Sequence, residues 1–350
     1  MAQPDVLRDD VETALNDPPI PWDRFRGATI LVTGATGVIG SAVARVLCTA
    51  NAAKGLGLSV VGQGRHPSKG RRLEAELGVR FLPADVRELS SATSGLDHAD
   101  FVVHAAAVTS SAQMVARPDE VLTTAVEGTR NVLDLARELE ARSVVYVSSM
   151  EVYGQGLTGV VTESDVGTLN PDDPRSSYPE GKRRAEALTA AYATEHGLHT
   201  TSARLGLTLG AGVPNDPANT RVPLQFARSV LAGRDIELHT DGAGVTNVCY
   251  LADAVRALLL LATKGAAGEA YNVANSQASM TIRRMAEVVA REVAGGAINV
   301  VVKPPEDLES RGYAPPSSYR LATDKIRALG WEPRYGMAEM YERMIASWRS

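Results

Sequence analysis

Cysteine is scarce in this chain of 350 residues. Its two cysteines, Cys48 and Cys249, are too few and too far apart for a zinc site, so we expect no bound metal and two buried, reduced thiols. Aromatic residues make up only 5% of the chain, which argues against a surface that stacks single-stranded bases. Positive charge is not in excess, because 36 Lys and Arg stand against 41 Asp and Glu, a net charge of −5. We therefore expect neither nucleic acid nor an anionic membrane as a partner.

A long hydrophobic run is also missing. The most apolar later stretch, 255–263, is interrupted by Arg256 and is far shorter than a bilayer span. The first twenty residues lack the basic and then apolar pattern of a signal peptide. Their charged side chains are mainly acidic, at Asp5, Asp9, Asp10, Glu12 and Asp17. We therefore expect a cytoplasmic protein.

What the chain does contain is an alternation of short apolar runs and helical patterns. Such alternation implies right-handed crossovers and a parallel sheet with helices on both faces. We therefore predict an α/β fold, a Rossmann-like doubly wound parallel sheet. Runs rich in β-branched residues predict strands at 29–33, 58–62, 79–82, 101–104, 144–148 and 200–205, and apolar spacing predicts helices at 38–50, 118–140 and around 182–192.

The alternation weakens after residue 206, where loops with Pro and Gly lengthen. We expect residues 1–26 to form an N-terminal extension that packs on the main body. Residues 27–206 are expected to form the Rossmann-like domain, to which 248–275 returns. A smaller C-terminal lobe at 207–247 and 276–350 is expected to bind the substrate, because ligands of such folds bind at the carboxyl ends of the strands.

Three glycines, each three residues from the next, lie between the first strand and the first helix. Glycines there permit a tight turn, close approach of backbone amides to a pyrophosphate, and close helix–strand packing. The helix N-terminus would face the phosphates. A glycine-rich turn without a ligand is the alternative, which the order of strand, loop and helix disfavours. The residues predicted to bind a dinucleotide here are Gly34, Thr36, Gly37, Val38, Ile39 and Gly40.

The second strand ends without the acidic residue that would hold a free ribose 2′-hydroxyl. Arg65 stands there instead, placed to receive a 2′-phosphate, so NADP(H) is favoured over NAD(H). A solvated basic turn is the alternative. Further cofactor contacts are predicted at Asp85 and Val86 after the third strand, beside the adenine, and at Ala105, Ala106 and Ala107 after the fourth, along the phosphates and ribose.

Tyr178 and Lys182 are four residues apart, which places them on one face of a helix. A nearby ammonium and a nicotinamide cation both stabilise phenolate and would lower the tyrosine pKa. This spacing alone is a weak signal, since it occurs by chance in many helices. It gains weight because Ser149 closes the preceding strand and supplies a hydroxyl at the same edge of the sheet.

Together these residues resemble the extended short-chain dehydrogenase/reductase family, in its nucleotide-sugar epimerase and dehydratase branch. The resemblance runs from Gly27 to the stretch 329–333 and implies a homodimer. It implies that hydride leaves a sugar carbon, usually C4, and later returns to the same sugar. It also implies that Tyr178 is the base toward a sugar hydroxyl and that Lys182 orients the nicotinamide ribose and tunes the tyrosine. Ser149 would hydrogen-bond the substrate oxygen, with Ser148 as the alternative one residue earlier.

Several positions depart from the family pattern. Ala125 stands where an asparagine is usual in the helix after the fourth strand. Leu207 replaces an asparagine that follows the position of Arg204, and Thr246 replaces the arginine that commonly clamps the sugar diphosphate. Arginines of the second lobe that would substitute are Arg221, Arg228 and Arg320, although each is equally expected as a surface charge.

Glu151 lies two residues beyond Ser149. In the branch's sugar 4,6-dehydratases the matching glutamate removes the C5 proton, and a preceding aspartate helps to expel the 6-hydroxyl. Here Met150 stands in place of that acid and cannot donate a proton. C5 epimerisation, or decarboxylation of a uronic acid, fits this combination better than 4,6-dehydration. The alternative is that Glu151 only hydrogen-bonds backbone or solvent.

The leading hypothesis is a redox-neutral enzyme on a nucleotide sugar, an epimerase, decarboxylase or dehydratase that retains its dinucleotide. An NADPH-dependent ketone reductase with a dissociable cofactor is the second. A non-catalytic dinucleotide sensor of the same fold is the third, and Ser149, Tyr178 and Lys182 argue against it because a sensor needs no tuned phenol.

Overall fold

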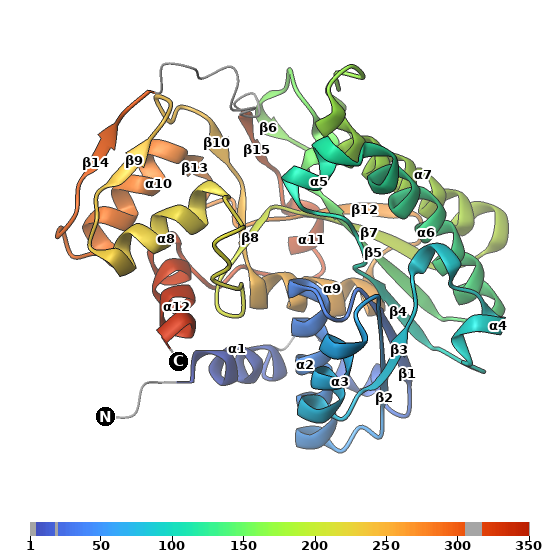
Figure 1. Ribbon diagram of the computed structural model, residues 1–350. Coiled ribbons are helices and arrows are strands. Elements are labelled where there is room, and N and C mark those ends of the chain that lie inside the picture. Colours follow the sequence, from blue (N-terminus) through green and yellow to red (C-terminus); the bar gives the residue numbers. More distant parts are fainter. Residues whose placement is uncertain (1–4, 18–19, 305–316, 350) are drawn as a thin grey trace.

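The computed structural model describes residues 5–17, 20–304 and 317–349 (Figure 1). Parts of the predicted N-terminal extension (1–4 and 18–19) and of the predicted second lobe (305–316 and 350) lie outside the described residues. None of the helices within the described ranges combines the length and the apolar character that a bilayer span requires.

Seven strands form the central sheet, in the order β12-β7-β5-β4-β1-β2-β3. All neighbours in it run parallel. The strand order reverses between β1 and β4, so the predicted Rossmann-like, doubly wound α/β fold is confirmed. The strands are β1 (Thr29–Thr33), β2 (Ser59–Gly64), β3 (Arg80–Pro83), β4 (Phe101–His104), β5 (Ser143–Ser149), β7 (Thr200–Leu205) and β12 (Glu269–Val273).

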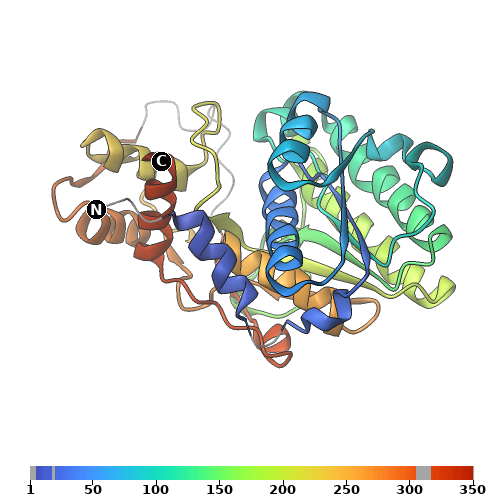
Figure 2. The same cartoon turned by 90° about the horizontal axis from the view of Figure 1, so that it is seen from below.

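Helices cover both faces of the sheet, as Figure 2 shows. On one face, α2 (Val38–Lys54), α3 (Pro67–Leu77) and α9 (Leu251–Lys264) share a hydrophobic cluster with the strands. On the other, α6 (Pro118–Glu138) and α7 (Ser177–His196) pack against each other. The helix α9 is apolar almost throughout because it packs on the sheet with one side and on neighbouring helices with the other.

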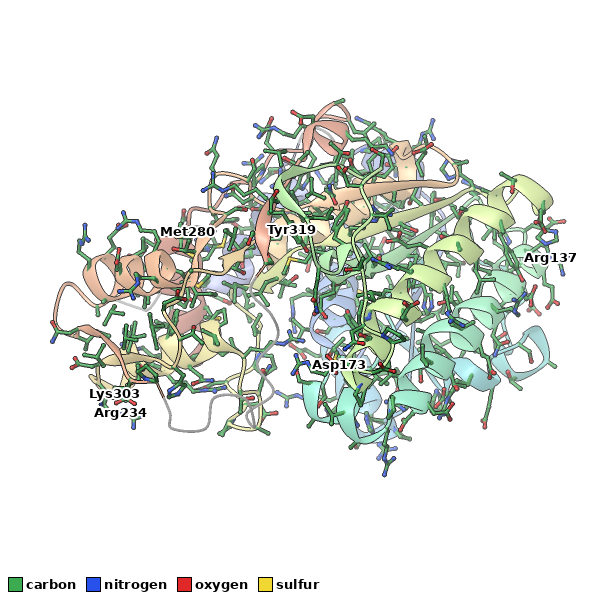
Figure 3. The ribbon with its side chains drawn as sticks, turned by 90° about the horizontal axis from the view of Figure 1, so that it is seen from above. Arg137, Asp173, Arg234, Met280, Lys303 and Tyr319 are labelled. Atoms are coloured by element: carbon green, nitrogen blue, oxygen red, sulfur yellow. The ribbon has the colours of Figure 1, made fainter. Side chains whose placement is uncertain are left out.

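The second lobe has a hydrophobic cluster of its own, drawn from residues between Leu209 and Ile345. Short two-stranded sheets pair β8 with β11, β9 with β14 and β10 with β13. The lobe contains β8 (Leu207–Leu209), α8 (Val222–Ala232), β9 (Ile236–Leu238), β10 (Val245–Thr246), β11 (Val248–Tyr250), β13 (Met280–Thr281), α10 (Ile282–Val288), the π-helical turn η5 (Val289–Val293), β14 (Val300–Val302) and α12 (Met337–Arg349). Figure 3 shows Arg234 and Lys303 side by side at its far edge, and Arg137 at the opposite end of the molecule.

Short elements complete the chain. Three of them, η3, β6 and β15, lie at the junction of the two lobes, where β6 pairs with β15 and the Tyr319 hydroxyl of β15 donates to the Met150 carbonyl of η3 at 3.2 Å. The short elements are η1 (Trp22–Phe25), η2 (Val86–Glu88), α4 (Ser91–Ser94), α5 (Ser111–Ala116), η3 (Met150–Tyr153), β6 (Thr158–Val161), η4 (Pro174–Ser176), β15 (Ser318–Leu321) and α11 (Asp324–Arg327).

The N-terminal extension forms α1 (Val6–Leu15), which packs on α2, α9 and α12. The Asp10 carboxylate accepts a hydrogen bond from Arg343 of α12 at 2.6 Å. Asp17 accepts one from Arg256 of α9 and one from Arg334, each at 2.7 Å. The extension therefore connects the Rossmann-like body to the second lobe.

We propose the domain division expected from the sequence, and the separate hydrophobic clusters support it. Some residues pack differently from that expectation. Val248 and the run 250–252, which the sequence assigned to the first domain, pack in the cluster of the second lobe. Ile326 and Trp331, which the sequence assigned to the second lobe, pack in the cluster beneath the sheet. The Trp331 Nε1 donates to the Asp253 carbonyl of α9 at 3.0 Å, so the chain returns to the first domain before α12.

Both cysteines are free thiols. Cys249 lies fully buried on β11, as expected, whereas Cys48 on α2 is only partly buried. Burial raises the pKa of Cys48 to about 11, so its sulfur is an unreactive thiol at neutral pH.

Candidate active site

A cavity of about 500 Å³ opens at the carboxyl edge of the central sheet. The glycine loop and the end of β4 form one side, and the end of β5 with the first turns of α7 forms another. Residues of the second lobe between 207 and 224 close the third side, next to Leu205 at the end of β7. The cavity thus lies at the point where the strand order reverses, where ligands of this fold bind.

The glycine loop passes so close to its neighbours that side chains are excluded. Gly34 has a φ of +66°, and a Cβ there would lie 2.8 Å from the Ala106 backbone. A Cβ on Gly40 would lie 2.3 Å from the Gly34 carbonyl oxygen. Gly37 caps α2 without a side chain, so the amides of the first turn are left to face the cavity. This edge is shaped to receive a phosphate group.

Ser149, Tyr178 and Lys182 meet in this cavity. Hydrogen bonding with the Ser149 hydroxyl lowers the pKa of the Tyr178 phenol and so favours the phenolate. The Lys182 Nζ donates to the Val147 carbonyl at 2.7 Å and lies 5.7 Å from the centre of the Tyr178 ring. Ser148 instead donates to Glu186 of α7 at 2.5 Å, so Ser149 is the serine that acts on the phenol.

The pKa of Tyr178 differs from the sequence expectation. Burial and the negative charge of Glu151 raise it, and these effects outweigh Ser149 and Arg221, which lower it. Burial lowers the pKa of Lys182 to about 8, against the opposing charges of Glu186 and Glu151. The protein by itself therefore holds a neutral phenol beside an ammonium that loses its proton near pH 8.

Glu151 lies in the first turn of η3 and also lines the cavity. Its amide donates to the Ser149 hydroxyl at 3.2 Å, which ties the two positions together. Solvent reaches Glu151 through the open cleft, but the protein atoms around it raise the pKa of its carboxyl by desolvation, while the charges of Arg221, Arg175 and Lys182 lower it. The site thus combines a phenol with a carboxyl group of raised pKa, two groups able to move protons.

Comparison with known proteins supplies the family. A model of the NAD dependent epimerase/dehydratase family matches residues 30–274. The chain belongs to this family. It is therefore an enzyme, as predicted, rather than a dinucleotide sensor, and its relatives include nucleotide-sugar epimerases, decarboxylases and dehydratases.

Three relatives show the range of the epimerase/dehydratase family. UDP-glucuronic acid decarboxylase 6 of Arabidopsis thaliana is 31% identical over 243 residues, 69% of this chain and 67% of that protein. The dTDP-4-dehydro-6-deoxy-D-allose reductase of a Streptomyces species is 29% identical over 287 residues, 81% of this chain and 84% of that protein. The dTDP-glucose 4,6-dehydratase of Streptomyces venezuelae, solved with NAD bound, superposes with a TM-score of 0.71 and 25% identity over 92% of this chain and 97% of that one.

The edge of the sheet fits the dinucleotide of the family. Of the cofactor residues predicted from the sequence, Gly34, the run 37–40, Ala105 and Ala107 line the cavity. Ala106 lies behind Gly34, and the Thr36 hydroxyl lies 3.1 Å from where a Cβ on Gly64 would be. The small side chains leave the space that the phosphates and ribose would fill.

The predicted adenine contacts lie beyond this cavity. Asp85 accepts from Arg87 at 2.7 Å, a partner that the sequence did not suggest. The Val86 side chain is buried, and a Cβ on Gly128 of α6 would lie 2.8 Å from it. The Val86 side chain therefore packs against α6, and its carbonyl accepts a hydrogen bond from Asn131 of the same helix at 3.1 Å.

Of the three second-lobe arginines considered from the sequence, Arg221 alone is among the cavity residues. Arg228 braces its own loop through the Asn219 and Asp216 carbonyl oxygens at 2.9 and 2.6 Å. Arg320 lies exposed on β15. Arg204 forms a partly buried ion pair with Glu186 at 2.7 Å, so it supports the strand end rather than the substrate.

The sequence missed Glu186, which lies one turn beyond Lys182 on α7 and bonds both Ser148 and Arg204. Its spacing of four residues from Lys182 was the available signal. Ala125, where the family usually has asparagine, serves packing here. A Cβ on Gly181 of α7 would lie 2.8 Å from the Ala125 Cβ, so the small residue allows α6 and α7 to approach closely.

Proposed function

We propose that the enzyme oxidises a nucleotide sugar transiently at C4, acts on the adjacent C5, and then reduces C4 again. The observation that carries this proposal is the position of Glu151 in the same cavity as Ser149 and Tyr178, close enough for its charge to raise the pKa of Tyr178. One cavity thereby offers a proton acceptor for the C4 hydroxyl and another for the neighbouring carbon.

Each residue has a defined part in the proposed reaction. Tyr178 takes the C4 hydroxyl proton as the C4–H bond breaks, while Ser149 holds the C4 oxygen and the Lys182 ammonium favours the phenolate. The glycine loop would hold a dinucleotide that would supply the acceptor for the C4 hydride, and the positive charge of its oxidised form would add to that of Lys182. Both charges oppose the burial that raises the tyrosine pKa.

The C4 ketone acidifies the C5 proton, which the ionised Glu151 removes. Return of a proton to C5 gives the epimer. Where C5 carries a carboxylate, the C5–carboxylate bond breaks instead, CO₂ leaves, and C5 takes a proton in its place. Elimination of the 6-hydroxyl needs a proton donor, and Met150 cannot be that donor because a thioether donates no proton.

Isotope exchange in D₂O tests the proposal. We expect the wild-type enzyme, with NAD or NADP and with UDP-glucuronic acid, UDP-glucose or dTDP-glucose, to place deuterium at C5 of a sugar that it turns over, as read by NMR. Glu151→Gln should lose this deuterium but still reduce the dinucleotide in a single turnover. Tyr178→Phe should lose both signals, by about 10²–10⁴-fold, because no ketone forms.

Two results contradict the proposal. The first is a Glu151→Gln enzyme that exchanges C5 at the wild-type rate, because the base must then be another group. The second is accumulation of a 4-keto-6-deoxy sugar, which would show that Met150 does not prevent dehydration.

An NADPH-dependent reductase of a nucleotide-linked ketone is the second candidate. It is favoured by Arg65 at the cofactor edge and by the 29% identity to a dTDP-sugar reductase. Denaturing the purified protein separates the candidates, because a redox-neutral enzyme releases tightly held dinucleotide. A dissociable reductase releases none and consumes NADPH in proportion to product.

We also propose a preference for NADP(H), a homodimer formed through α6 and α7, and a location in the cytoplasm. The basic side chain of Arg65 supports the first and the family resemblance supports the second. Light scattering coupled to size exclusion, with charge-reversing substitutions on the outer faces of α6 and α7, checks the dimer.

A further inference from the structure

Arg221 brings a positive charge from the second lobe into the cavity. It immediately precedes α8 and lines the cavity with Ser149, Glu151 and Tyr178. Its Nη2 donates across the cleft to the Thr109 carbonyl of the loop after β4, at 3.1 Å. Its charge acts on both Glu151 and Tyr178, which places the guanidinium within electrostatic reach of the two groups that would act on the sugar.

The guanidinium of Arg221 keeps most of its binding capacity. Within residues 5–17, 20–304 and 317–349, no carboxylate lies within ion-pair distance of it, and the Thr109 carbonyl is the one acceptor that its side chain bonds. By contrast, Arg228 of the same lobe bonds three oxygens of the 215–219 loop, and Arg204 is matched by Glu186. An arginine has five N–H donors in a planar fork.

We propose that Arg221 binds the carboxylate of a nucleotide uronic acid and so selects that class of sugar over neutral hexoses. This inference rests on the proposed function, because it takes Glu151 to act at C5. A uronic acid carries its carboxylate on C5, next to that base. Two carboxylates in one cavity repel each other unless a cation lies with them. Lys182 also lines the cavity, but its Nζ donates to the Val147 carbonyl beneath the phenol, so Arg221 is the cation with donors left for a second carboxylate.

The planar guanidinium matches a carboxylate with two parallel hydrogen bonds, which a lysine cannot reproduce. A phosphate offers similar oxygens, so the diphosphate on C1 is the other source of an anion. The position of Arg221 favours the carboxylate. Its charge is felt at Glu151 and Tyr178, which in the proposed reaction act at C5 and C4, whereas the diphosphate leaves the ring from C1 on the other side of the ring oxygen.

Calorimetric binding measurements distinguish the sugar carboxylate from the diphosphate as the anion that Arg221 binds. The background is Tyr178→Phe with saturating NAD, which prevents turnover, and the probes are UDP-glucuronic acid, UDP-glucose and UDP, with the thymidine series alongside. We expect Arg221→Gln to weaken binding of the uronic acid by about 10- to 100-fold and to leave the neutral sugar and the diphosphate unchanged. The affinity of Arg221→Lys for the uronic acid should lie between that of the parent protein and that of Arg221→Gln. The control is Arg234→Gln, beyond the other end of α8 at the far edge of the lobe (Figure 3), which should change none.

An equal loss for all three probes assigns Arg221 to the diphosphate and overturns the inference. So does an unchanged affinity in Arg221→Gln, or a parent protein that binds UDP-glucose as tightly as UDP-glucuronic acid. These measurements give affinities and need no turnover, so they can be interpreted even if the enzyme exchanges no deuterium at C5. Failure of this inference is therefore distinguishable from failure of the proposed function.

Discussion

At the end of β2, the guanidinium of Arg65 is shared by two acidic side chains. Its Nη1 lies 3.2 Å from Glu120 of α6 and 3.9 Å from Asp85. From the sequence alone this arginine was expected to meet a 2′-phosphate directly. The nearby carboxylates repel a phosphate, so a bound NADP would have to take Arg65 from Glu120.

Removing that competitor should therefore favour NADP. We expect Glu120→Gln to tighten NADP binding relative to NAD by about two- to fivefold, because exposed ion pairs of this kind are weak. Arg65→Ala should abolish any preference for NADP and leave NAD binding as it was. Fluorescence titration of both dinucleotides measures these ratios. Tighter binding of NAD by the wild type, unaffected by Arg65→Ala, would remove the argument.

The sequence predicted the properties of single residues where the chemistry of the side chain itself determines them. It did not predict them where residues distant in the sequence determine them. The spacing of Tyr178 and Lys182 located the phenol and the ammonium. It gave no information on Glu151 raising the tyrosine pKa, because the two residues are 27 positions apart and meet only when β5 and α7 pack. Arg65 shows the same limit, since Glu120 comes to it from a distant helix.

On α7, three successive turns carry Tyr178, Lys182 and Glu186. The last raises the pKa of Lys182, against the burial that lowers it to about 8. The other acid acting on Lys182 is Glu151 of η3, and the ring of Tyr146 on β5 lies 4.6 Å from Nζ. Glu186 therefore helps to keep the ammonium charged at neutral pH.

Glu186→Gln should move the alkaline limb of the activity profile to lower pH. A group that raises the lysine pKa is lost, so Lys182 gives up its proton below pH 8 and the phenolate loses its cation earlier. The dependence of kcat on pH measures the limb. Ser148→Ala is the matched control, because it removes another bond of Glu186 without removing its charge. An unmoved limb in Glu186→Gln would limit this residue to a structural role.

Elements were predictable in proportion to their apolar pattern. The six strands expected from the sequence form, with ends shifted by a residue or two. The seventh, β12, has a weak pattern because Asn272 is buried within it. Its amide oxygen accepts from the Tyr153 hydroxyl at 2.7 Å, a compensation that only the folded chain shows. The two- and three-residue strands of the second lobe are too short for periodicity to identify.

Across the whole molecule, buried ion pairs join the N-terminal extension to both lobes. Asp17 and Arg256 are almost fully buried, and Asp17 also receives Arg334. Each charge is tolerated inside because its partner is there. Neither composition nor periodicity could pair residues so distant along the chain.

We expect Asp17→Asn to lower the free energy of unfolding by about 1.5–3 kcal/mol, because Arg256 loses one charged hydrogen-bond partner and keeps only Asp253 as a buried carboxylate. Chemical denaturation measures this loss. Asp9→Asn is the control, because Asp9 is more than half exposed where it meets Arg343, and its loss should cost less than about 1 kcal/mol. If the two variants unfold alike, the buried pairs contribute no more than a surface contact.

The ion pairs between the N-terminal extension and the C-terminal part of the chain have a consequence for synthesis. Asp17 and Arg334 are 317 positions apart, and Asp10 and Arg343 are 333 apart. On the ribosome, the acidic partners leave the exit tunnel long before the basic ones exist. The strands and helices of the first domain have by then been made, but α1 has no finished site to occupy. Closure of the extension over both lobes therefore belongs to the completed polypeptide, and a nascent chain carries these carboxylates in water until its last helix appears.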